Sequence, residues 1–337
     1  MPVLSVLGGA AIGYHLLTSP RVHSKQNTTI VIPPGSTATE IIARLSEEQI
    51  ISSPLLVRAY LLVTGRGAQL KAGAYRFPSP ITPLEVIRKL VAGDVYREKV
   101  TFPEGLTRFD VADIIARLPL KDAGKAYALV NDKRLIADLD PQADSLEGYL
   151  FPDTYEYDET TTAEQLIEKM VRRFRQVLRP EYLERARELK MTLRQVVTLA
   201  SMIEKEAKIA SERPLISSVF HNRLVRGMKL ECDPTVLYAA RLAGIRRQTI
   251  TKSDLMRSSP YNTYLFPGPP PGPIASPGLA SLHAALYPAD TDYLYFVVDG
   301  SRKDGSHRFA TTPEEHADNV AVYRRSLQER TLRDARP

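Results

Sequence analysis

The sequence contains no tryptophan and only one cysteine, Cys232. The lone cysteine excludes an intramolecular disulfide and any zinc or iron–sulfur site built from cysteine ligands. The absence of tryptophan removes a large aromatic platform on which a sugar ring could stack. No internal run of twenty apolar residues occurs, which excludes a polytopic membrane protein. With 43% hydrophobic and 25% charged residues among its 337, the chain can form a packed core, and wholesale disorder is excluded.

Neither a nucleic-acid partner nor a metal or other cofactor is expected. The net charge of +6 comes from 45 Lys and Arg against 39 Asp and Glu, and the basic residues are not interleaved with aromatic ones as nucleic-acid binding would require. His307 and His316 lack metal-ligand spacing, and no His-Glu-x-x-His motif occurs. The arginines near the end, in residues 327–337, are interpreted as a solvated basic tail.

The first twenty residues contain no Asp, Glu, Lys or Arg. As a helix they would be about 30 Å long, enough for one bilayer core. We therefore expect a transmembrane anchor over residues 1–20, with its cytoplasmic start missing, because the basic residues that normally precede an anchor are absent. A cleaved signal peptide and a buried helix remain alternatives, although no Ala-x-Ala cleavage site is evident.

A strand–turn–helix pattern occurs twice. IVIPPGSTATEIIARL (residues 30–45) recurs as VTFPEGLTRFDVADIIARL (residues 100–118), and both copies end in IIARL. Between them we expect a strand near residues 71–77 and a helix over 83–92, with Thr82 as its N-cap. The pattern predicts a β-α-α-β-α module over residues 28–98 and a second small α+β module over 99–145. A binding role and a spacer role for the first module both remain open.

Two glutamates near the end of a predicted helix are the candidate acids. The helix begins after Thr192. Glu204 and Glu206 lie on opposite edges of its apolar stripe, each roughly 80° around the helix axis from the centre of the stripe. A half-desolvated carboxyl has a raised pKa, as a general acid near neutral pH requires. The alternative is that both are solvated residues of an ordinary amphipathic helix.

Several polar and turn-forming clusters accompany this helix. A rigid Pro/Gly segment (residues 268–278) is suited to a preorganised binding wall. An aromatic segment (residues 146–157) could form a groove wall or a domain joint. Six ordered motifs resemble the endolytic lytic transglycosylases of the MltG or YceG-like family: EGYLFPDTY (147–155), ASMIEKE (200–206), VFHNRL (219–224), DPTV (233–236), PYNTY (260–264) and PPGPI (270–274). The resemblance covers nearly the whole chain.

The resemblance implies an α+β fold with a membrane anchor, a LysM-like module and a mixed α+β catalytic domain over residues 146–326. It implies a single-pass protein of the cytoplasmic membrane whose catalytic domain lies outside the cytoplasm. Its substrate would be peptidoglycan glycan strands, cleaved at the β-1,4 bond between N-acetylmuramic acid and N-acetylglucosamine with formation of 1,6-anhydro ends. Peptidoglycan synthases are implied as partners. Small departures from the family pattern occur at Cys232, Ser276 and Ala310.

By motif, the catalytic residue is Glu206, acting as acid and then as base, and Glu204 is the second candidate. One carboxyl group suffices because the substrate's own C6 hydroxyl attacks, whereas ordinary glycosidases need two carboxyls. A non-catalytic peptidoglycan-binding scaffold that recruits cell-wall synthases is the alternative function. The residues expected to bind the sugar are Asp233, Tyr261, Asn262, Thr263 and His307.

Overall fold

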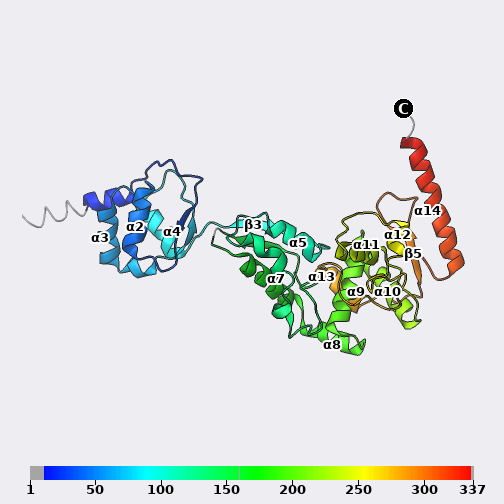
Figure 1. Cartoon of the computed structure of the whole chain (residues 1–337). Helices are drawn as coiled ribbons and strands as arrows, with labels where there is room; N and C mark the ends of the chain where they lie inside the picture. Colours follow the sequence, from blue (N-terminus) through cyan, green and yellow to red (C-terminus); the bar gives the residue numbers. More distant parts are fainter. Residues whose placement is uncertain (1–10, 159, 335–337) are drawn as a thin grey trace, which may run out of the picture. The chain divides into compact units, whose positions relative to one another are not determined.

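The structure is a computed structural model that describes residues 11–158 and 160–334. Helices alternate with three short two-stranded sheets, which confirms the expected α+β class (Figure 1). The chain forms two compact units. Among the described residues, the N-terminal unit comprises residues 11–100, 119–121, 156–158 and 160–162, and the C-terminal unit comprises residues 101–118, 122–155 and 163–334.

The N-terminal unit follows the predicted order of strand, two helices, strand and helix. Strands β1 and β2 pair antiparallel, with Ile30 opposite Tyr75. Thr37 and Thr82 each form a capping box with a glutamate three residues later, which fixes where their helices begin. The elements are β1 (Ile30–Ile32), α2 (Ala38–Glu47), α3 (Pro54–Thr64), η1 (Arg66–Gln69), β2 (Gly73–Tyr75) and α4 (Pro83–Ala92).

The structure describes only the second half of the predicted anchor. Residues 11–18 are helical, and Leu17 is buried in the hydrophobic core of the N-terminal unit. Within the described parts of the chain, no helix combines the length and the apolar character needed to cross a bilayer. Residues 1–10 lie outside the described residues. The anchor and the LysM-like character of the module therefore stay predictions.

The C-terminal unit is mainly helical. Region 121–145 contains only short helical turns. Strand β5 begins at Tyr295 and pairs antiparallel with β6, with Val298 opposite His307. Strands β3 and β4, whose residues 98–100 and 156–157 belong to the N-terminal unit, form the third pair. The remaining elements are β3 (Glu98–Thr101), α5 (Arg108–Ile115), η2 (Ala123–Lys125), α6 (Ala126–Leu129), η3 (Lys133–Ile136), β4 (Thr154–Tyr157), α7 (Ala163–Val177), α8 (Pro180–Glu188), α9 (Leu193–Glu206), η4 (Ala210–Glu212), α10 (Arg213–Val225), α11 (Asp233–Leu242), α12 (Lys252–Leu255), α13 (Leu279–Leu286), β5 (Tyr295–Val298), β6 (His307–Ala310) and α14 (Pro313–Asp334).

Helix α9 is the central helix of this unit and packs against α10, α11 and α13 (Figure 1). It begins with a capping box between Thr192 and Gln195 and ends at Glu206, because Ala207 adopts an extended conformation. Its buried face is wider than the predicted stripe and takes in every residue from 196 to 203. Ser201 accepts a hydrogen bond of 3.0 Å from the amide of Ile274, which fixes the Pro/Gly segment to the helix.

Candidate active site

Glu206, the last residue of α9, faces a pocket of about 340 Å³. The walls of this pocket come from α10, the start of α11, the β5–β6 hairpin and α14. Besides Glu206, the polar and charged residues that line it are Arg223, Glu231, Asp233, Tyr264, His307, His316 and Tyr323. Of the residues predicted to act on or bind the sugar, the pocket thus brings together Glu206, Asp233 and His307.

The environment of Glu206 favours its protonated form. Burial raises the pKa of this carboxyl to about 7. The Cys232 thiol, whose sulfur lies 3.2 Å from Glu206 Oε1, donates to the carboxyl and partly offsets this rise. The negative charge of Asp233 raises the pKa further. A carboxyl that still holds its proton near neutral pH can serve as a general acid.

Asp233 lies beside Glu206 because α11 begins there. Its Oδ1 accepts a hydrogen bond of 2.5 Å from the Tyr264 hydroxyl, which also lines the pocket. Burial and the Asp233 carboxylate raise the pKa of Tyr264 well above the usual range, so that its hydroxyl stays a donor. The sequence analysis missed Tyr264, although it belongs to the PYNTY motif.

The other three predicted sugar-binding residues support the pocket wall from behind and do not line it. Thr263 is buried, and its hydroxyl accepts a 2.9 Å hydrogen bond from the amide of Cys232. Asn262 is fully buried and donates to the carbonyls of Leu255 and Arg257 at 3.0 Å each. The ring of Tyr261 packs against that of Tyr238, with centroids 5.0 Å apart. These contacts fix the loop that carries Tyr264.

Glu204 points away from this pocket and is engaged in packing. Its Oε2 accepts hydrogen bonds from the Gly278 amide at 3.0 Å and the Ser281 hydroxyl at 2.7 Å, which caps the start of α13. The Arg213 guanidinium lies 3.5 Å from Oε1. The two glutamates at the end of α9 therefore have different surroundings: Glu204 contacts the start of α13, and Glu206 lines the pocket.

His307 is held by a carboxylate that the sequence analysis missed. The Glu212 carboxylate accepts a hydrogen bond from the His307 amide at 2.8 Å and lies 2.7 Å from its ring Nδ1. Ninety-five residues separate the two along the chain. No local sequence pattern could have indicated this pairing.

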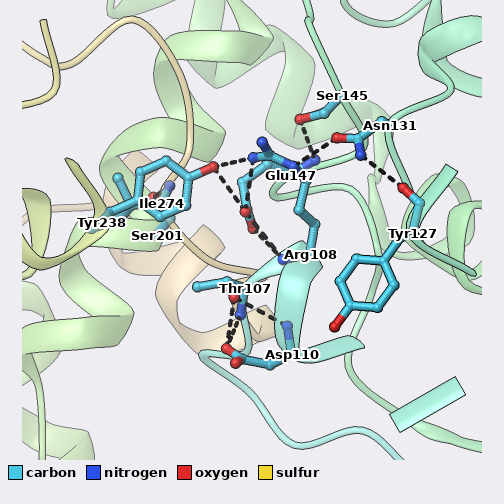
Figure 2. Close-up of polar contacts among 10 residues, drawn as sticks. All are labelled: Thr107, Arg108, Asp110, Tyr127, Asn131, Ser145, Glu147, Ser201, Tyr238 and Ile274. Carbon is cyan, nitrogen blue, oxygen red and sulfur yellow. Dashed lines mark hydrogen bonds and ion pairs between the residues drawn. The ribbon is translucent and has the colours of Figure 1, made fainter. Parts of the chain in front are cut away.

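A second buried carboxyl, Glu147, organises the region shown in Figure 2. It accepts hydrogen bonds from the Arg108 amide at 3.0 and 3.1 Å and from the Tyr238 hydroxyl at 2.9 Å. Burial raises its pKa to about 7, although the positive charge of Arg108 opposes the rise. Tyr238 lies on α11, so this cluster fixes the helix whose first residue, Asp233, lines the pocket.

The described residues include no cluster of three or more His, Cys, Asp or Glu side chains arranged to hold a metal ion. The polar groups that line the pocket are the Glu206 carboxyl with its raised pKa, two further carboxylates, one guanidinium, two tyrosine hydroxyls and two imidazoles, and a carboxyl of this kind can transfer a proton.

Comparison with known proteins finds matches along most of the chain. The profile of the YceG-like family matches residues 30–322. An endolytic murein transglycosylase of Bacillus subtilis is 34% identical over 328 residues, covering 92% of this chain and 89% of that protein. One of Streptococcus pneumoniae is 32% identical over 89% of this chain, which spans 59% of that longer protein. The crystal structure of a YceG-like protein from Listeria monocytogenes matches with a TM-score of 0.58 and 33% identity, covering 88% of this chain and 99% of that one.

Proposed function

The chain belongs to the YceG-like family, and from this premise we propose that it is an endolytic lytic transglycosylase of peptidoglycan. It cleaves the β-1,4 bond between N-acetylmuramic acid and N-acetylglucosamine within glycan strands and leaves 1,6-anhydro ends. The observation that supports this most strongly is Glu206, a carboxyl with a pKa of about 7 in the wall of a polar pocket.

Glu206 begins the reaction as the general acid. It gives its proton to the glycosidic oxygen, so that the bond from this oxygen to the anomeric carbon breaks and N-acetylglucosamine leaves with a free hydroxyl. The C6 hydroxyl of the N-acetylmuramic acid residue then forms the new bond to the anomeric carbon. Its proton returns to the Glu206 carboxylate, which restores the starting state without consuming water.

Asp233 stabilises the positive charge that develops at the anomeric carbon. Its carboxylate lines the same pocket as Glu206 and is oriented by the Tyr264 hydroxyl. Fixed charges aimed at a developing charge are among the largest contributions to catalysis. His307 contacts the sugar from the hairpin side, and Tyr261, Asn262 and Thr263 contribute to binding through the loop that they fix.

We further propose that residues 1–20 anchor the protein in the cytoplasmic membrane by a single pass, with the catalytic unit outside the cytoplasm and near peptidoglycan synthases. Protease digestion of intact spheroplasts tests this arrangement. Loss of the C-terminal unit without lysis is expected, and protection of that unit until lysis would contradict it.

Mass spectrometry of the products formed from uncrosslinked glycan strands tests the activity. The full chain should yield ends that are lighter than reducing ends by one water, and Glu206→Gln should yield none while remaining folded. Reducing ends from the wild type would indicate a hydrolase with a second carboxylate. No cleavage by either protein would favour the scaffold function.

A further inference from the structure

The pocket that holds Glu206 is also lined by His307, which is paired with the carboxylate of Glu212. His307 opens β6 and Glu212 ends η4, immediately before α10. Both oxygens of Glu212 are directed at His307, one at its amide and one at ring Nδ1. The two side chains are only 5% and 11% exposed. A buried carboxylate is costly unless it is hydrogen-bonded, and the bonds that satisfy this one are those to His307.

The pair and Glu206 belong to one small piece of structure. Residues 207–212 connect the end of α9 with the start of α10, so the two glutamates lie at opposite ends of a short connection. This connection packs on the β5–β6 hairpin: a Cβ placed on Gly305 would lie 2.9 Å from Lys208 Cδ. Phe296 of β5 meets the His307 ring edge-on, with centroids 5.3 Å apart. The imidazole is therefore held on three sides, by the connection, by β5 and by its own strand.

The Glu212 contact decides which ring nitrogen can accept a proton. A carboxylate acts as an acceptor, so it places the hydrogen on Nδ1 and leaves a lone pair on Nε2. Nε2 of His307 has no hydrogen-bond partner among the described residues. The ring of His221, in contrast, has Nε2 2.9 Å from the Ala285 carbonyl. His316 is the other histidine that lines the pocket. Its buried Nδ1 has no hydrogen-bond partner in the described part of the chain.

We propose that His307 is a second catalytic residue, whose Nε2 accepts the proton of the attacking C6 hydroxyl, and that Glu212 is the positioning residue that fixes its tautomer. This rests on the proposed function and changes one step of it. Glu206 still gives its proton to the leaving oxygen. The proton released as the C6 oxygen bonds to the anomeric carbon goes to His307, and exchange with solvent then returns His307 and Glu206 to their starting protonation states.

Two groups allow bond breaking and bond making to overlap in time. With Glu206 alone, the carboxyl must lose its proton completely before it can accept another. A separate acceptor removes this order, because the acid and the base are present in their working forms at once. The same division of labour, with a carboxylate holding a histidine in one tautomer, activates hydroxyl nucleophiles elsewhere in enzymology.

The experiment measures anhydro-end formation by the full chain for wild type, His307→Ala, Glu212→Gln and, as a matched control, the exposed His283→Gln on α13. We expect His307→Ala to lower kcat by about 10²–10⁴-fold, the usual contribution of a general base, with little change in KM. Added imidazole should restore part of that rate. Glu212→Gln should lower kcat as well, because an amide that donates to Nδ1 moves the hydrogen to Nε2. His283→Gln should match wild type.

Several results would overturn the proposal. A rise in KM at unchanged kcat would assign His307 to binding, and a loss that imidazole does not restore in a protein with wild-type melting would assign it to structure. Wild-type kcat in Glu212→Gln would remove the positioning role. Failure of the proposed function is distinguishable, because then the wild type makes no anhydro ends or Glu206→Gln keeps making them. If Glu206→Gln is inactive while His307→Ala is fully active, only the catalytic role of His307 is contradicted.

Discussion

The Cys232 thiol donates to Oε1 of Glu206 across 3.2 Å, so the candidate acid is oriented by the residue that immediately precedes α11. Because this contact occupies Oε1, Oε2 is the oxygen that remains to carry and deliver the proton. Cys232 is buried, and both burial and the Glu206 carboxyl raise the pKa of its thiol well above the usual value. It therefore acts as a neutral donor and not as a nucleophile.

Replacing Cys232 by serine should move the pH dependence of activity. A hydroxyl is a stronger donor than a thiol and favours the charged carboxylate, so Cys232→Ser should lower the Glu206 pKa below its value of about 7. Because a general acid must be protonated, the alkaline limb of the kcat/KM profile should shift to lower pH. Cys232→Ala, which donates nothing, should shift it to higher pH. Identical profiles for all three proteins would contradict the assignment of Glu206 as the acid.

Glu206→Gln should stabilise the C-terminal unit at alkaline pH. The folded pKa of about 7 lies above the ordinary value of 4.5, so the folded state holds the proton over this range while the unfolded state releases it. Stability from this group is complete below pH 4.5 and is lost as pH rises through 7, by up to roughly 3 kcal/mol. Glutamine does not ionise, so the variant does not lose stability in this way as the pH rises.

Hydrogen exchange of the α9 amides measures this stability locally. At pH 8 the exchange of Glu206→Gln, corrected for the intrinsic pH dependence, should be slower than that of wild type, and at pH 4 the two should agree. A difference of equal size at both pH values would show that burial does not control the ionisation of Glu206.

Glu204→Gln should retain cleavage and lose some stability. The Gly278 amide and the Ser281 hydroxyl donate to the same oxygen of Glu204, so the amide oxygen of glutamine can keep both bonds, but the charge facing Arg213 is lost. A hydrogen bond to a charged group contributes about 1.5–3 kcal/mol, so we expect the melting temperature to fall by several degrees. Anhydro ends should still form at temperatures well below melting. Their complete absence there would move the catalytic assignment from Glu206 to Glu204.

Gly148→Ala should destabilise the C-terminal unit by about 2–4 kcal/mol, the sum of left-handed backbone strain and overpacking. Gly148 has φ +83°, and a Cβ there would lie 2.5 Å from Pro273 and 2.9 Å from Val197 of α9. Gly227→Ala is the matched control, because Gly227 has φ +65° with nothing within 4 Å of an added Cβ. Thermal melting should show a clearly larger loss for Gly148→Ala. Equal losses of thermal stability in the two variants would mean that the Pro/Gly segment does not leave too little space for a methyl group at Gly148.

The sequence alone determined features that depend on neighbouring residues. Thr82 and Thr192 located the starts of α4 and α9, because the capping contacts of a helix start are formed within four residues. The order of elements in the N-terminal unit followed from its hydrophobic periodicity. The family, too, could be identified from ordered motifs, because these survive as short strings.

Tertiary structure decided what the α9 helix alone leaves undetermined. By helical geometry Glu204 and Glu206 are equivalent, and only the position of α13 on one side and of the β5–β6 hairpin on the other directs one into packing and the other into a pocket. The PYNTY motif was recognised, but burial assigns Asn262 to the loop and Tyr264 to the pocket wall. Glu212 reaches His307 only because the chain returns after 95 residues. Such pairings depend on long-range packing, which no local pattern of residues encodes.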